Sequence, residues 1–284
     1  MPQKSPFVVD AAWLQERLGQ PGLTIVDASW YLPAQGRDAK AEYEAGHIPG
    51  AKFFDLDLVV DPDSNLPHML PQPLLFAQYV GSMGVAADDT IVVYDGPGMF
   101  SAPRVWWMFR VMGAKNVLVL DGGFDNWKAE GRPVTAEPTR IAPCVFNPDF
   151  DEQRVAGLED VRRAVATGEG QVADARPAGR FSAVDPEPRP GLRGGHMPGA
   201  KNLPASALSQ GGRLLPIEDL SRKLEGAGLD LTQPVVTSCG SGVTAAVITL
   251  ALESVGHTDN RLYDGSWAEW GGRGDTPVET GTGE

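Results

Sequence analysis

One cysteine in the sequence stands where a thiol could act as a nucleophile. Cys239 follows the apolar run 234–238 and precedes a short loop rich in glycine and hydroxyl residues, after which a helix-like run, 246–255, begins. A thiol between a strand and a helix N-terminus meets backbone N–H groups and the positive end of the helix dipole, which favour the thiolate. Because thiolates are nucleophiles, the pattern predicts a catalytic cysteine. A buried, inert cysteine is the alternative interpretation.

The bulk properties of the chain limit what this cysteine could serve. The 284 residues are enough for two domains, and the net charge of −13 argues against a nucleic-acid or anionic-membrane surface. No apolar run approaches the roughly 18 to 20 residues that a membrane-spanning helix needs. The N-terminus shows no apolar signal core, so a cytoplasmic location is expected. Two cysteines make neither a disulfide framework nor a cysteine-based metal site, so no metal is expected.

Short motifs occur twice in the chain and in the same order, which indicates duplication of one domain. The repeated segments are Gly-His-x-Pro-Gly-Ala-Lys at 46–52 and 195–201, Asp-Gly-x-aromatic at 121–124 and 264–267, and an apolar residue before Asp-Ala at 26–28 and 173–175.

The duplication predicts two domains of ordinary size joined by a connector. We expect an N-terminal domain at 1–137, a linker at 138–152 and a C-terminal catalytic domain at 153–284. The linker contains Pro138, Pro143 and Pro148, which suit a stiff, extended segment.

Within each half, short apolar runs alternate with amphipathic ones. This alternation predicts an α/β fold, with each domain a mostly parallel sheet covered by helices on both faces. Ligands of such sheets bind at the carboxyl ends of the strands, which is where Cys239 is expected. The predicted strands are 23–27, 51–53, 90–94, 117–120, 171–173, 200–202, 235–238 and 261–263. The predicted helices are 11–18, 39–45, 74–83, 102–112, 124–130, 158–167, 217–225, 244–255 and 267–270.

The two copies can be compared residue by residue to separate chemistry from architecture. Asp95 occupies the position of Cys239 in the first copy, so sulfur chemistry is expected in the second copy alone. His47 and His196 occur at the same place in both copies, which favours a structural role in the turn. His68 has no counterpart in the second copy, and the residues alone leave its role open.

The chain resembles the rhodanese superfamily, and specifically its tandem-domain sulfurtransferases. The resemblance covers about residues 7–277, and its most specific part is the loop Cys-Gly-Ser-Gly-Val-Thr-Ala at 239–245, which is similar to the active-site loop of the 3-mercaptopyruvate branch. Thiosulfate-preferring members have cationic residues after the cysteine, where this chain has Gly240 and Ser241. Other matching stretches are 27–33, 101–110, 179–181, 186–189 and 263–267.

The resemblance implies a sulfurtransferase that carries sulfur from 3-mercaptopyruvate as a persulfide on Cys239, releases pyruvate and needs no cofactor. It implies that Arg180 and Arg189 hold the substrate carboxylate, since a guanidinium binds a carboxylate with two N–H donors. It also implies a relay of Ser241, His68 and Asp57 beside the cysteine. Backbone N–H groups of the loop, including those of Gly240, Gly242, Val243 and Thr244, would hold the persulfide. The implied partners are an acceptor thiol, a thioredoxin-like protein or cyanide, for a monomer or weak oligomer.

Three other functions compete with this interpretation. The same cysteine could transfer sulfur from thiosulfate to cyanide. A phosphatase of the same fold would need an arginine six residues after the cysteine, and residue 245 is alanine. A tandem sensor or binding module without activity is the non-enzymatic alternative, against which the retention of Cys239 and of both arginines argues.

Overall fold

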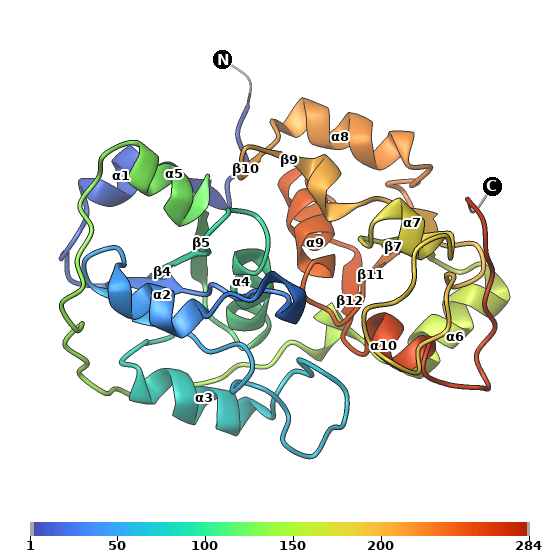
Figure 1. Ribbon diagram of the computed structural model, residues 1–284, viewed down its shortest axis with the longest axis horizontal. Helices are drawn as coiled ribbons and strands as arrows, with labels where there is room; N and C mark the ends of the chain where they lie inside the picture. Colours follow the sequence, from blue (N-terminus) through green and yellow to red (C-terminus); the bar gives the residue numbers. More distant parts are fainter. Residues whose placement is uncertain (1–2, 283–284) are drawn as a thin grey trace.

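The computed structural model describes residues 3–282, and it contains the same sheet twice (Figure 1). Each sheet has five strands, all paired in parallel. In spatial order, the N-terminal strands are β1 (Val8–Val9), β5 (Asn116–Leu120), β4 (Thr90–Tyr94), β2 (Leu23–Asp27) and β3 (Ala51–Phe53). The C-terminal strands, in the corresponding order, are β6 (Val155–Ala156), β12 (Asn260–Tyr263), β11 (Val235–Ser238), β7 (Gln171–Asp174) and β8 (Lys201–Asn202). The predicted duplication and fold class are therefore confirmed.

Helices cover both faces of each sheet, because the central strands are rich in β-branched residues and apolar on both sides. The outer face of the N-terminal sheet carries α1 (Ala11–Gln15), α2 (Ala39–Ala45) and α5 (Gly123–Ala129), and its inner face carries α3 (Pro73–Ser82) and α4 (Ala102–Val111). The outer face of the C-terminal sheet carries α6 (Leu158–Thr167), α7 (Ala178–Phe181) and α10 (Ser266–Trp270), and its inner face carries α8 (Ile217–Gly226) and α9 (Ala245–Ser254). The two inner faces share one core.

The helices α4 and α9 pack against each other at the centre of the molecule (Figure 1). Every residue of α9 is buried, and so is every residue of α4 except Arg110. A helix that is apolar nearly all round must be buried on all sides, and the boundary between two domains offers that burial. The two domains are thus joined by a continuous hydrophobic core as well as by the chain.

A short hairpin that the sequence did not predict ties the second domain to the first. It pairs β9 (Ser209–Gln210) with β10 (Arg213–Leu214), and the turn between them consists of Gly211 and Gly212, both with positive φ. The carbonyl of Gly212 accepts the N–H of Gly122 at 3.0 Å, and the N–H of Leu214 donates to the Asp121 carboxylate at 2.9 Å.

The segment between α5 and the 3₁₀ turn η2 (Glu152–Arg154) contains neither helix nor strand. It lies along the first domain, where the N–H of Cys144 donates to the carbonyl of Gly81. The division of the chain at 137 and 153 stays a prediction. Two further 3₁₀ turns are η1 (Pro33–Gln35) and η3 (Ala205–Leu208). Within residues 3–282, the helices are too short or too polar for any of them to span a membrane.

Candidate active site

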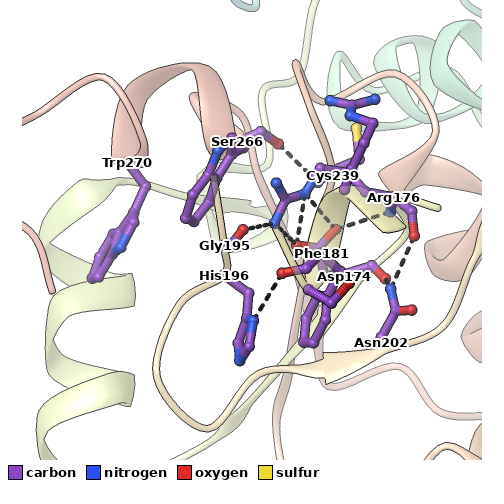
Figure 2. Close-up of polar contacts among 12 residues, drawn as sticks. Asp174, Arg176, Phe181, Gly195, His196, Asn202, Cys239, Ser266 and Trp270 are labelled. Carbon is purple, nitrogen blue, oxygen red and sulfur yellow. Dashed lines mark hydrogen bonds and ion pairs between the residues drawn. The ribbon is translucent and has the colours of Figure 1, made fainter. Parts of the chain in front are cut away.

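Cys239 lies at the carboxyl end of β11, immediately before the loop that leads into α9. Its side chain is only 2% exposed, yet it lines a cleft of about 430 Å³ whose walls come from both domains. Its backbone N–H donates to the hydroxyl of Ser266 at 3.2 Å (Figure 2). Trp30 and Phe100 line the same cleft from the first domain. The thiol is therefore shielded from bulk water while it faces a space that can hold a small molecule.

The loop after Cys239 presents backbone N–H groups without acceptors. Among residues 3–282, no protein atom accepts a hydrogen bond from the N–H groups of residues 240–244. Five such groups beside a helix N-terminus form a site that favours negative charge. This arrangement can hold an anionic sulfur once the cysteine carries one.

The first copy shows what the same loop does when it binds an anion. Asp95 stands in place of the cysteine, and its buried carboxylate accepts the N–H groups of Gly98, Phe100, Ser101 and Ala102 at 2.6–2.9 Å. Burial raises the pKa of this carboxyl, and the four N–H donors oppose that rise. The loop of this fold thus cradles a negative group with its own amides, and in the first copy an aspartate occupies the cradle.

Arg180 and Arg189, to which the family resemblance assigns the substrate carboxylate, both line the cleft beside the cysteine loop. A Cβ atom at Gly240 would lie 3.0 Å from Nη2 of Arg180, which is a tight contact, and 3.7 Å from Nη1 of Arg189, which is an ordinary one. Glycine at this position therefore leaves room for the guanidinium of Arg180 beside the loop. One edge of Arg180 is held by the buried Glu187 carboxylate, with an Nη2–Oε2 distance of 2.5 Å. Burial lowers the pKa of the Arg189 guanidinium, and the neighbouring Cys239 opposes that change.

The structure also brings together the three residues of the predicted relay. Nδ1 of His68 lies 3.0 Å from the hydroxyl of Ser241, and its Nε2 lies 3.0 Å from the carboxylate of Asp57. His68 and Asp57 come from the loop between β3 and α3, whereas Ser241 belongs to the cysteine loop of the other domain. The indole N–H of Trp30 donates to both oxygens of Asp57 at 3.0 and 3.1 Å, which fixes the orientation of the carboxylate.

Hydrogen-bond roles within this chain of groups follow from the donors available. The hydrogen bond from His68 lowers the pKa of Asp57, so its carboxylate is an acceptor at neutral pH and Nε2 must carry a proton. Nδ1 of a neutral His68 is then an acceptor, and Ser241 donates its hydroxyl hydrogen to it. Arg189 can only donate, and its Nη2 lies 3.3 Å from the same serine oxygen. The serine proton is therefore directed at the imidazole.

Sequence reasoning missed the ion pair that supports this relay. Arg104 on α4 is completely buried, and its Nη2 donates to the carbonyl of His68 at 2.6 Å and lies 2.7 Å from the carboxylate of Asp264 in the other domain. His68 has a φ of 59°, a left-handed conformation that costs free energy in a residue with a side chain. Arg104 was present in a stretch that matched the family, but its role required knowledge of the fold.

The repeated histidines lie in the turns of both copies. Nδ1 of His47 lies 2.8 Å from the carbonyl of Tyr43, and Nδ1 of His196 lies 2.9 Å from that of Phe181 (Figure 2). Each imidazole also stacks on the aromatic ring of the same partner. Both histidines are buried, and neither of them lines the Cys239 cleft.

Comparison with known proteins shows which family the chain belongs to. The family of the rhodanese-like domain matches the chain twice, at residues 10–130 and 158–273. The protein belongs to the rhodanese family, as a member with two tandem domains.

Individual relatives cover almost the whole chain. The 3-mercaptopyruvate sulfurtransferase of Escherichia coli K12 is 43% identical over 274 residues, which are 96% of this chain and 98% of that protein. The thiosulfate sulfurtransferase of Gallus gallus is 44% identical, over 93% of this chain and 92% of its own. The crystal structure of SseA from Escherichia coli, described as a 3-mercaptopyruvate sulfotransferase, superposes with a TM-score of 0.86 at 40% identity, over 92% of this chain and 98% of that one.

Proposed function

We propose that this protein is a 3-mercaptopyruvate sulfurtransferase that carries sulfur as a persulfide on Cys239 and passes it to a thiol acceptor. The observation that supports it most directly is the placement of the cysteine. Cys239 lines a two-domain cleft together with Arg180 and Arg189, and the two residues that follow it, Gly240 and Ser241, carry no charge. A donor whose charge is a carboxylate some distance from its sulfur suits that arrangement.

The arginines have the geometry to bind the carboxylate of the donor. Arg180 uses one edge of its guanidinium to bind Glu187, and this contact orients its remaining N–H donors. Arg189 contributes a second guanidinium close to the same residue of the loop, Gly240. Two charge-assisted contacts fix orientation as well as charge, so that the sulfur of the donor is directed toward Cys239.

The transfer step can be written with all atoms accounted for. The thiolate of Cys239 attacks the sulfur of mercaptopyruvate and forms an S–S bond. The C–S bond breaks, and its electron pair leaves on carbon as the enolate of pyruvate. The relay of Asp57, His68 and Ser241 supplies a proton to that carbon, and the outer S–H of the persulfide returns one to the relay. The N–H groups of residues 240–244, including those of Gly242, Val243 and Thr244, stabilise the resulting persulfide anion.

A second reaction returns the enzyme to its starting state. The thiolate of an acceptor attacks the outer sulfur, takes it as its own persulfide and leaves Cys239 as a thiolate. Because Cys239 lines an open cleft, an acceptor can reach the outer sulfur. We propose a low-molecular-weight thiol, a thioredoxin-like protein or cyanide as that acceptor. The choice of acceptor, a monomeric or weakly oligomeric state, a cytoplasmic location and independence of cofactors stay predictions from the sequence.

Thiosulfate is the second candidate donor, because a thiosulfate sulfurtransferase is among the relatives at 44% identity. Thiosulfate carries both negative charges close to the reacting sulfur, and a cationic residue directly after the cysteine would suit it. This chain has Gly240 there. We expect kcat/KM to be higher for mercaptopyruvate than for thiosulfate under the same acceptor concentration.

Mass spectrometry of the intact protein tests the proposal. After one equivalent of mercaptopyruvate and no acceptor, we expect one added sulfur atom on Cys239 and one equivalent of pyruvate. Cys239→Ser should give neither, whereas Cys144→Ser, which changes the exposed cysteine, should behave as the wild type. Full turnover by Cys239→Ser, or pyruvate release without sulfur on the protein, would refute the mechanism.

A further inference from the structure

In the second domain a buried arginine, Arg176, lies against the carboxylate of Asp174, the last residue of β7. The guanidinium of Arg176 donates to the Asp174 carboxylate at 2.7–3.1 Å and to the carbonyl of Gly195 at 2.7 Å (Figure 2). It also binds Glu187 at 2.7 Å and lies over the ring of Trp267 at 4.2 Å. The guanidinium thus has an anion, a carbonyl and an aromatic face as partners within one domain.

The first domain contains counterparts of three of these four partners, Asp174, Gly195 and Trp267, without the arginine. Asp27 and Ser29 correspond to Asp174 and Arg176, since in each copy the N–H of the second residue donates to the carboxylate of the first at 2.9 Å. Gly46 corresponds to Gly195 in the repeated turn.

The aromatic position is preserved as well. Phe124 corresponds to Trp267, because their N–H groups bind the carbonyls of Asp95 and Cys239, at 2.8 and 2.9 Å. The acid, the turn and the aromatic ring therefore remain in the first copy, while the cation has become a serine.

A cavity of about 440 Å³ is present at this place. Asp27, Ser29, Gly46 and Phe124 all line it, together with Tyr43 of α2. Ser29 is much shorter than arginine and leaves the space in front of Asp27 unfilled. The corresponding carboxylate of the second copy faces a guanidinium, whereas this one faces the cavity.

The carboxylate of Asp27 has no cationic partner among residues 3–282, although it is only 2% exposed. Burial raises its pKa to about 6, so it is ionised at neutral pH. The nearby cations are otherwise engaged: Arg37 binds Glu42 at 2.6 Å, and Lys128 lies 3.1 Å from Asp125. Asp27 has hydrogen bonds from the neutral residues Ser29 and Tyr94 but no counter-ion, and a buried charge that lacks a counter-ion is costly unless a ligand supplies one.

We propose that this cavity of the N-terminal domain binds a small molecule that carries a guanidinium group on a slender alkyl stem. The guanidinium would bind Asp27 with two N–H donors, donate to the carbonyl of Gly46 and lie against the ring of Phe124, as Arg176 does with its partners in the second domain. The proposal does not depend on the reaction at Cys239: Asp27, Gly46 and Phe124 do not line the cleft of that cysteine, although Tyr31 and Arg37 line both spaces.

The dimensions of the cavity favour a free small molecule over an arginine of a partner protein. Two ion pairs of partly exposed side chains line the cavity, Arg37 with Glu42 and Lys128 with Asp125, so a flat protein surface would have to displace both pairs. A free ligand with a narrow alkyl stem is the occupant that we expect to leave both pairs in place. An arginine side chain in a short peptide offers the same chemistry from a bulkier source, and the experiment distinguishes the two.

Calorimetric titration of the full-length protein with n-butylguanidinium at pH 7.5 provides the test. We expect saturable binding at one site per chain, in the millimolar range or tighter. The neutral isostere n-butylurea, and an acetylated, amidated Gly-Arg-Gly peptide, should bind at least about tenfold more weakly. Binding of the peptide as tight as that of butylguanidinium would overturn the choice of a free small molecule.

Three variants locate the site. Asp27→Asn removes the charge with little change of shape and should weaken butylguanidinium binding at least about tenfold. Ser29→Arg places a guanidinium in the cavity from within and should abolish binding. Asp88→Asn removes an exposed carboxylate of the same domain that does not line the cavity, and it should bind as the wild type. Thermal midpoints confirm that each variant is folded. Absence of saturable binding, or equal binding by wild type and Asp27→Asn, would overturn the proposal.

Discussion

The guanidinium of Arg104 and the carboxylate of Asp264 lie 2.7 Å apart, and both side chains are almost completely buried. One comes from α4 of the first domain and the other follows β12 of the second. Arg104 holds the carbonyl of His68, and Asp264 accepts the N–H of Leu70 at 2.6 Å. Arg104 also approaches the carbonyl of Gly242 at 3.4 Å. This single ion pair therefore holds the histidine loop of one domain against the cysteine loop of the other.

Arg104→Lys tests the positioning role of that pair. Lysine keeps the charge but cannot reach the His68 carbonyl and Asp264 with a fixed planar group. We expect kcat for pyruvate release to fall by about ten- to a hundredfold, because the imidazole is displaced from Ser241. KM should change little, since Arg180 and Arg189 are untouched. Steady-state kinetics with mercaptopyruvate measure both parameters.

Arg110→Lys is the matched control for that variant. Arg110 is a second arginine on α4, and it pairs with Glu253 at 2.6 Å rather than with the histidine loop. The Arg110→Lys variant should lower the thermal midpoint about as much as the Arg104→Lys variant does, and its kcat should stay near the wild-type value. Equal losses of kcat in both variants would show a general effect of weakened packing instead of positioning.

The sequence was sufficient to predict the main elements because their signals are local. The runs at 23–27, 90–94 and 235–238 are rich in β-branched residues, and all three are strands with those bounds. The edge strands β1 and β6 are only two residues long, and too short for any pattern to identify. The hairpin of β9 and β10 is stabilised by contacts with the other domain, and such contacts cannot be predicted from the local sequence.

The candidate site divides in the same way. Cys239 could be found from its place between a strand and a helix, and the family resemblance supplied Arg180, Arg189 and the relay. Whether His68 would reach Ser241 could not be known, because the two residues are 173 positions apart and lie in different domains. Arg104 was overlooked because a charged residue in an apolar helix becomes meaningful only when its partners are visible.

Asp57→Asn tests the direction of the relay. An asparagine amide can present its NH₂ group to Nε2 of His68, which moves the imidazole proton to Nδ1 and prevents it from accepting the hydroxyl hydrogen of Ser241. We expect kcat to fall by about 10²- to 10⁴-fold with little change in KM. Asp63→Asn, at an exposed position of the same loop, should leave kcat unchanged. An unchanged kcat in Asp57→Asn would remove the relay from the mechanism.

Gly240→Ala tests how close the arginines must come to the cysteine loop. Its Cβ would lie 3.0 Å from Nη2 of Arg180, so the guanidinium must shift. Because that group is proposed to hold the carboxylate of the donor, we expect KM for mercaptopyruvate to rise about tenfold. Gly226→Ala places a methyl group where nothing lies within 4 Å, and should leave KM unchanged. Steady-state assays of both variants measure KM. An unchanged KM in Gly240→Ala would show that the approach of Arg180 to the loop is not needed for substrate binding.

Asp27→Asn has a pH-dependent effect on stability whose sign follows from burial. Burial raises the pKa of Asp27 from 3.8 to about 6, and the nearby Asp95 adds to the rise, while hydrogen bonds from Ser29 and Tyr94 oppose it. Between these two pH values the folded protein binds more protons at this site than the unfolded chain, so the free energy of unfolding falls as pH rises from about 4 to 6.

Asparagine does not titrate, so the variant should gain stability relative to the wild type over that interval. The gain should reach at most about 3 kcal/mol at pH 8 relative to the difference at pH 4. Urea denaturation of both proteins at the two pH values measures this gain, with Asp88→Asn, at an exposed position outside the cavity, as a control that should show no such change. Saturating butylguanidinium should reduce the gain at pH 8, because the ligand stabilises the ionised wild-type carboxylate. A difference independent of pH would mean that Asp27 has the same pKa in the folded and unfolded states, which would contradict the effect of burial.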